Sequence, residues 1–155
     1  MRKLTSLLGI AAAVVVTALS VTGCSVAGPI SAGNAYVPVP TTPGTTVAYL
    51  EIRNNGAADE LVSVQSSVGG TVTLRAPVTH GTTVMAMRSV GDIPVPADST
   101  VHLAPNGYHL MITGVNGLQG GKAITLKLTF AHAGTITVVA LVTNPESGGS
   151  SYFLN

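Results

Sequence analysis

The side chains best suited to chemistry in this sequence are a few methionines and histidines. After the first residue, methionine occurs only as Met85, Met87 and Met111, and His109 lies two positions before the last of them. A spacing of two places both side chains of a pair on one face of a β-strand. Thioether sulfur and imidazole nitrogen suit copper(I), a soft ion, and offer little to calcium or magnesium. The pattern therefore indicates a soft-metal site that needs no thiolate.

A purely structural role competes with this interpretation. Methionine pairs at strand spacing are usually core residues, and that explanation suits Met85 and Met87 taken alone. His109 and Met111 fit it less well, because a face that buried Met111 would also bury His109, and a buried imidazole needs a polar partner. The residues by themselves leave both explanations open.

The N-terminal residues have the order of an export signal. A positive start at Arg2 and Lys3 precedes an apolar stretch from Leu7 to Leu19 and then small residues before Cys24. The stretch is short for a membrane span, which needs about 20 residues. Cys24, the only cysteine, follows Val-Thr-Gly, which resembles a bacterial lipobox and implies cleavage before a lipidated Cys24. An uncleaved anchor and a free thiol in a leftover signal are the alternatives.

Composition bounds the rest of the chain. Formal net charge is +1 without a basic cluster, which argues against nucleic-acid binding. We expect a lipoprotein signal peptide over 1–23, a lipidated tether over 24–32, a β-sandwich domain over 33–145 and a flexible C-terminal tail over 146–155. Lipidation would leave no free cysteine, so a soft-metal site in the domain would depend on methionine and histidine.

The domain is predicted to be all-β, because short runs rich in Val and Thr alternate with turn signals of Gly, Pro and Asn. Alternation is clearest over 124–130, where Ile, Leu, Leu and Phe are separated by Thr, Lys and Thr. About eight short strands at this spacing favour an antiparallel β-sandwich. We expect them near 46–54, 60–67, 71–78, 83–90, 99–104, 108–114, 123–131 and 135–143.

Several segments resemble one family. Gly-Tyr-His-Leu-Met at 107–111, preceded by Pro105, is similar to the signature turn and strand of the extracytoplasmic copper chaperones called PCu(A)C. Segments 48–54, 93–97 and 126–134 resemble further parts of that family. The resemblance implies a cupredoxin-like sandwich that binds copper(I) on the outer face of the bacterial cell membrane. It also implies delivery of the copper to a membrane oxidase or another cuproenzyme.

The family pattern also implies a ligand set. It places a methionine 22 positions before the histidine, so Met87, His109 and Met111 are the expected ligands. It opens with a histidine about a dozen residues earlier, where this chain has Arg75, and a guanidinium is not a copper ligand. His80, in a His-Gly turn, is one candidate for a fourth ligand, and an exposed turn residue is its alternative role. Met85 is the other candidate.

Two functions of different classes fit these observations. The leading hypothesis is a copper(I) chaperone that passes its ion on by ligand exchange. The alternative is a non-metal interaction or adhesion module with a degenerate metal site, to which Arg75 gives weight because folds host many functions. We expect no enzyme, since no triad, paired acids or cofactor loop is recognisable. His102 and His132 are expected to be surface or structural residues.

Overall fold

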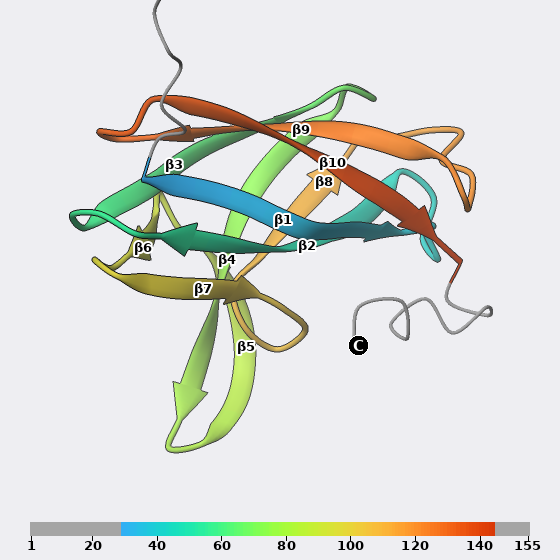
Figure 1. Cartoon of the computed structure of the whole chain (residues 1–155). Coiled ribbons are helices and arrows are strands. Elements are labelled where there is room, and N and C mark those ends of the chain that lie inside the picture. The colour runs from blue at the N-terminus through green and yellow to red at the C-terminus, as the bar shows by residue number, and fades with distance from the viewer. Residues whose placement is uncertain (1–28, 145–155) are drawn as a thin grey trace, which may run out of the picture.

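Ten strands and no helix make up the part of the chain that the computed structural model describes, residues 29–144. The predicted signal peptide, Cys24 and the predicted C-terminal tail lie outside the described residues. The strands are β1 (Ile30–Pro38), β2 (Thr45–Asn54), β3 (Asp59–Ser66), β4 (Thr71–His80), β5 (Thr83–Ser89), β6 (Ile93–Val95), β7 (Ser99–Leu103), β8 (His109–Thr113), β9 (Ala123–Phe130) and β10 (Thr135–Thr143) (Figure 1).

All eight predicted strands are confirmed, and β1 and β6 are additional. β1 begins at Ile30, so residues 30–32, which were expected in the tether, already belong to the sheet. That boundary was placed too late because small residues resemble a tether until their partners, β2 and β10, are known. β6 is a three-residue strand at the edge of the sheet, where Pro94 is tolerated.

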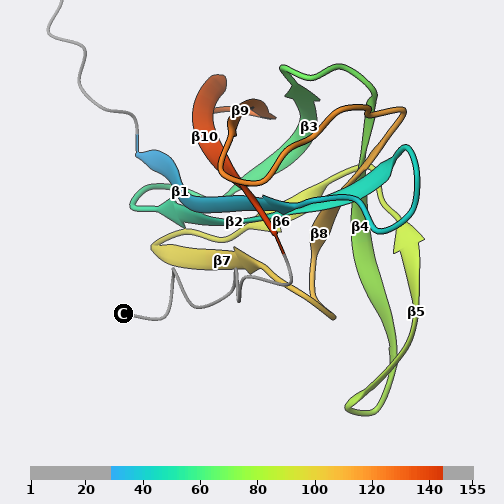
Figure 2. The same cartoon turned by 90° about the vertical axis from the view of Figure 1, so that its right-hand side faces the viewer.

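The strands follow the order β5-β4-β8-β2-β1-β10-β9-β3-β6, with β7 also paired to β2. Every pair is antiparallel except β1 with β10. β2 links two layers, since Thr45–Ala48 pair with β8 whereas Leu50–Asn54 pair with β7. Figure 2 shows β8, β4 and β5 turned away from β1, β2 and β7. The strand that carries His109 therefore reaches the rest of the sandwich through β2.

The core follows the alternation seen in the sequence. In β9 the four apolar side chains from Ile124 to Phe130 are buried, as predicted, and the residues between them are partly or fully exposed. Burying each such side chain contributes roughly 1.5–3 kcal/mol. The largest fully buried side chains come from both layers and include Leu50, Ile52, Leu61, Ile93, Leu110, Ile112, Leu126 and Leu128.

The β4–β5 hairpin projects beyond the sandwich (Figures 1 and 2). β5 is the last strand of the order, so one of its edges has no strand from the described part of the chain beside it. Six of its seven residues are exposed, and Met87 alone is partly buried. The hairpin thus combines an anchored base beside β8 with an exposed tip.

Candidate metal centre

The sequence of β8 decides which of its side chains face outward. Leu110 and Ile112 are fully buried, whereas His109, Met111 and Thr113 are partly exposed on the opposite face. The strand is preceded by a tight turn in which Gly107 N–H donates to the Ala104 carbonyl at 3.0 Å. His109 and Met111 are therefore neighbours on the outer face of the sheet.

A hydrogen bond fixes the His109 ring. Its Nδ1 lies 3.2 Å from the carbonyl oxygen of Gly107. A carbonyl oxygen can only accept, so Nδ1 carries the hydrogen and donates, and Nε2 keeps its lone pair. Metal-ligating histidines commonly have such a bond from their other nitrogen, because it sets tautomer and orientation. His109 is thus prepared to act as an Nε2 ligand.

Strand β4 brings the third expected ligand to the same face. Arg75 pairs with His109 and Thr73 with Met111, and residues directly opposite each other share a face of the sheet. On the other edge of β4, Pro77 pairs with Met87 of β5. Met87, His109 and Met111 thus lie on one face, and we call them the outer-face group. Met87 is separated from the other two by the width of β4.

Arg75 lies inside this group, at the position where the family resemblance implies a histidine. Its Nη1 donates to Ser89 Oγ at 2.9 Å and its Nη2 donates to the Met87 carbonyl at 3.2 Å. Both acceptors belong to β5, so the guanidinium is directed toward β5. Its Nε is buried and has no hydrogen-bond partner among the described residues. The sequence identified this residue but could not predict these contacts.

Tyr49 borders His109 on the β2 side, and Tyr36 packs against Tyr49. The Tyr49 and His109 ring centroids are 6.3 Å apart, and Tyr36 of β1 lies 5.1 Å from Tyr49. Burial raises the pKa of both phenols, and for Tyr49 its neighbour Tyr36 adds to the effect. Sequence reasoning missed both residues, because Tyr49 precedes His109 by many positions and only the sheet brings them together.

The two candidates for a fourth ligand lie toward the hairpin tip. His80 pairs with Thr83 at the tip, five residues beyond Arg75, which is about 16 Å along the strand. An odd separation also directs the His80 side chain to the other face of β4. Met85 lies next to a register shift and is 68% exposed. The structure does not bring either residue into the outer-face group.

The remaining histidines have carboxylate partners elsewhere. His102 Nδ1 is 3.1 Å from Glu51 Oε1, and His132 Nδ1 is 3.1 Å from Asp59 Oδ1. Within residues 29–144 no three side chains of the types His, Cys, Asp and Glu are grouped so that they could hold a metal ion. The same residues contain no helix long and apolar enough to span a membrane.

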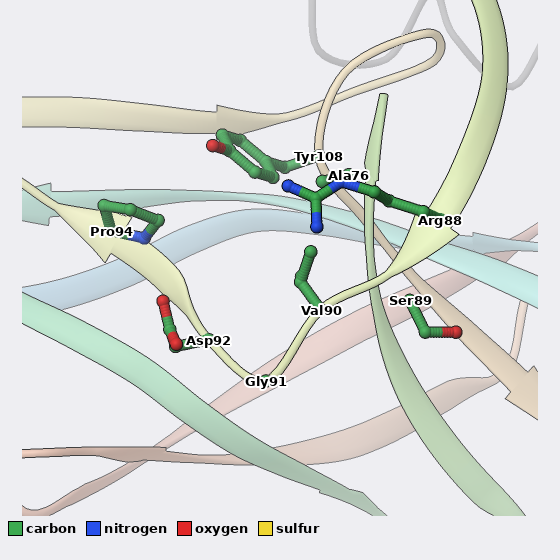
Figure 3. A pocket seen from close by; sticks show the side chains of 8 residues that line it. All are labelled: Ala76, Arg88, Ser89, Val90, Gly91, Asp92, Pro94 and Tyr108. Atoms are coloured by element: carbon green, nitrogen blue, oxygen red, sulfur yellow. The ribbon is translucent and has the colours of Figure 1, made fainter. Parts of the chain in front are cut away.

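A cavity lies behind the outer-face group. This cavity of about 360 Å³ opens on the other side of the β4–β5 hairpin base, lined by Ala76, Arg88, Asp92 and Tyr108 among others (Figure 3). Tyr108 directly precedes His109, and Arg88 lies between Met87 and Ser89 in β5. Sequence reasoning gave no signal for this cavity, because it forms between segments that are distant in the chain.

The donors of the outer-face group are two thioethers and one imidazole, all uncharged. Soft thioether ligands select copper(I), and imidazole is also acceptable to it, whereas hard ions require oxygen ligands. No cysteine lies among the described residues, so the thiolate of a blue-copper electron-transfer site is missing there. The group has the chemistry of a site that holds a soft ion without a tight grip.

This fold is that of the cupredoxin-like PCuAC domains. Among solved structures, the copper-bound PCuAC domain from PmoF2 is 22% identical, with a TM-score of 0.63 over 76% of this chain and 95% of that domain. The copper(I) form of DR1885 from Deinococcus radiodurans is 27% identical, with a TM-score of 0.59 over 72% of this chain and 76% of that one.

Within that class, the chain belongs to the LpqE-like family. The family model, described as "Putative lipoprotein LpqE-like", matches residues 30–142. A curated relative, "Putative lipoprotein Lxx21020" of Leifsonia xyli subsp. xyli (strain CTCB07), is 30% identical over 98% of this chain and 99% of its own length. The matched residues include every strand from β1 to β9 and nearly all of β10.

Proposed function

We propose that this protein is a copper(I)-binding chaperone that delivers copper to a membrane oxidase or another cuproenzyme. The observation that carries the proposal is the arrangement of β8. His109 and Met111 share the outer face, and the hydrogen bond to Gly107 leaves His109 Nε2 available. Met87 supplies a second thioether from the same face across β4. The copper-bound and copper(I) forms of the similar domains support this choice of ion.

Release would proceed by ligand exchange. All three side chains are only partly buried, so an approaching partner can reach the ion without opening the core. Neutral thioethers bind more weakly than a thiolate would, and a partner with better donors can displace them one at a time. Copper is the cargo in this mechanism, and the protein has no redox step of its own.

We place the protein on the extracytoplasmic face of the bacterial cell membrane, anchored by a lipid on Cys24. The Val-Thr-Gly-Cys sequence supports this location, and so do the lipoprotein descriptions of the family and of the curated relative. The proposed partners are the copper ion, the recipient cuproenzyme and, through the lipid, the membrane.

Copper(I) affinity of His109→Ala and His80→Ala, measured against a competing chelator, tests the site. The wild-type domain should bind one equivalent, with both sulfur and nitrogen in its X-ray absorption spectrum. His109→Ala should lower the affinity by about 100-fold or more, because loss of a ligand costs more than loss of a residue that only hydrogen-bonds to a ligand. His80→Ala should leave it unchanged, because His80 is about 16 Å along the strand from Arg75.

His102→Ala is the matched control, since His102 is an exposed strand histidine outside the outer-face group. Equal affinities for wild type, His109→Ala and His102→Ala would reject the site. A clear loss in His80→Ala would mean that the hairpin tip folds back to supply a fourth ligand. A shell of oxygen and nitrogen alone would reject the thioether ligands.

One observation favours the alternative of a non-metal interaction module. Arg75 stands in the outer-face group with a positive charge and no carboxylate ion pair among the described residues. A cation there opposes metal binding and would suit an acidic partner protein. Absence of copper(I) binding by the wild-type domain would favour this alternative.

A further inference from the structure

The guanidinium of Arg75 has unused binding capacity. A guanidinium has five N–H donors, and those of Arg75 make two hydrogen bonds with described residues, to Ser89 Oγ and the Met87 carbonyl. Both acceptors are uncharged. Nε is buried without an acceptor, and the ion pairs of the described residues do not include Arg75. A half-buried positive charge thus lacks a counter-ion within residues 29–144.

This charge lies where copper(I) would be held. Arg75 pairs with His109 on one side and with Ser89 on the other, and it donates to the main chain of Met87. The outer-face group contributes three neutral donors, so a bound copper(I) would keep its full charge beside a guanidinium. Two neighbouring cations repel each other, and an anion between them would offset that repulsion.

We infer that Arg75 holds a halide ion that completes the copper(I) site as its fourth ligand. The inference rests on the proposed function and deepens it. A guanidinium forms charge-assisted hydrogen bonds with anions, and the heavier halides are soft donors that match copper(I). A single-atom anion also needs little room among half-buried side chains. Where a histidine would be a ligand itself, the arginine recruits a ligand.

Copper(I) affinity in sodium bromide and in sodium fluoride of equal concentration tests the inference. Fluoride has the same charge but is a hard anion and a poor copper(I) ligand. The protein and the competing chelator equilibrate with the same free copper(I). Complexes between free copper(I) and halide therefore affect both equally and cancel in the ratio of the two affinities. Bromide should raise the wild-type affinity on the order of tenfold, a typical coupling between two ligands. X-ray absorption at the copper edge should detect bromine in the shell.

Arg75→Gln should abolish both the bromide effect and the bromine signal. Arg88→Gln, which removes an exposed arginine from the opposite face of the same hairpin, should retain both. Arg75→His should bind copper(I) more tightly than wild type in fluoride and gain nothing from bromide. Unfolding curves of the three variants establish that they are folded.

The outcomes separate the inference from the proposed function. Copper(I) binding that is independent of halide, or a bromide effect that persists in Arg75→Gln, would overturn the inference and leave copper binding intact. Failure of the wild-type protein to bind copper(I) in either salt would overturn the proposed function, and the inference with it.

Discussion

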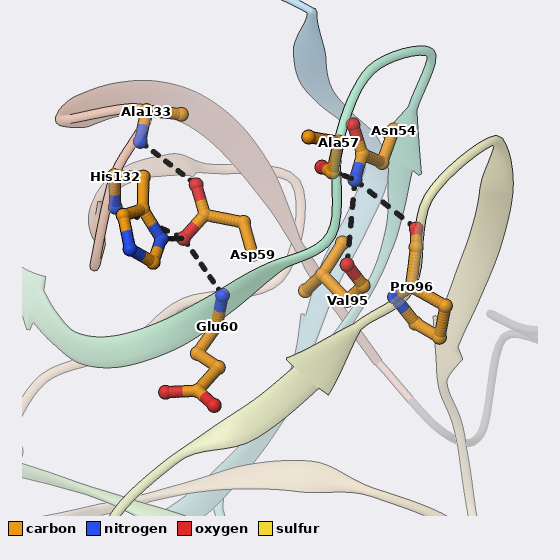
Figure 4. A network of polar contacts seen from close by, with 8 residues as sticks. All are labelled: Asn54, Ala57, Asp59, Glu60, Val95, Pro96, His132 and Ala133. Carbon is orange, nitrogen blue, oxygen red and sulfur yellow. Dashed lines mark hydrogen bonds and ion pairs between the residues drawn. The ribbon is translucent and has the colours of Figure 1, made fainter.

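A single carboxylate, Asp59, joins the start of β3 to the β9–β10 turn (Figure 4). Its side chain is 4% exposed. Burial raises the pKa of Asp59, but hydrogen bonds to the carboxylate outweigh burial and hold the pKa below its usual value. The donors are Glu60 N–H at 2.8 Å, His132 N–H at 3.0 Å, His132 Nδ1 at 3.1 Å and Ala133 N–H at 2.7 Å.

Asp59→Asn should lower the free energy of unfolding by about 2 kcal/mol at pH 7, because an amide N–H₂ cannot accept the bonds that one carboxylate oxygen accepts. A lowered folded-state pKa stabilises the protein above the unfolded-state pKa of about 4, and this contribution is lost as the pH falls through the folded-state value. Urea unfolding at pH 7 and pH 3 should therefore show a smaller difference between wild type and variant in acid.

Glu60→Gln is the control for Asp59→Asn, since Glu60 is the neighbouring acid with an exposed side chain. It should change stability by less than about 0.5 kcal/mol. Equal stabilities of Asp59→Asn and wild type at pH 7 would contradict the role assigned to the carboxylate.

At the residue scale, the sequence predicts the candidate copper ligands better than the contacts that surround them. The spacing of His109 and Met111 predicted a shared face, and the structure has them on one face of β8. The neighbouring ring of Tyr49 and the acceptors of Arg75 required the register between strands. Cross-strand register depends on the whole sandwich, and the local periodicity of the sequence does not determine it.

Among the elements, the short connection from β3 to β4 sets how β4 meets β8. Gly70 has a φ of +78°, and a Cβ added there would overlap the carbonyl oxygen of Thr113 at the end of β8. Gly69, one residue earlier, has a φ of +74° and open space around the same position. The two glycines have nearly equal φ values, but only Gly70 lies against the end of β8.

Gly70→Ala should therefore destabilise the protein more than Gly69→Ala does. Gly69→Ala should cost about 1 kcal/mol, from the left-handed backbone alone, whereas the clash at Gly70 should add roughly 1–3 kcal/mol. Urea unfolding measures both values. Gly70→Ala should also weaken copper(I) binding, because a shifted β4 moves Arg75 and Met87 relative to His109. Equal stabilities for the two variants would contradict this account.

Element prediction succeeded where alternation was strong and failed where it was interrupted. β9 alternates along its whole length and was predicted almost to the residue. β1 contains Gly33 and Asn34, the second with a φ of +50°, and its pairing with β2 shifts register there. Such a bulge removes the period of two on which a sequence-based prediction depends. β6 is too short to show any period.

For the whole molecule, the proposed lipid anchor on Cys24 would decide where copper is handled. Cys24→Ala should release the protein from the membrane or leave it unprocessed, because lipidation requires the cysteine sulfur. Ser25→Ala, one residue later, is the matched control and should leave membrane retention unchanged. Cell fractionation and the mass of the mature chain provide the measurements. Normal cleavage with full membrane retention of Cys24→Ala would contradict the lipid anchor.

The placement of β1 has a mechanical consequence for a tethered protein. β1 is the first strand after the proposed tether, and it is hydrogen-bonded to β2 on one side and to β10 on the other. A pull on the tether along β1 loads the bonds on both sides in shear, so they resist the force together. A force that arrives through the tether would therefore be shared by β2 and β10 before it reaches β8, which is hydrogen-bonded to the far end of β2.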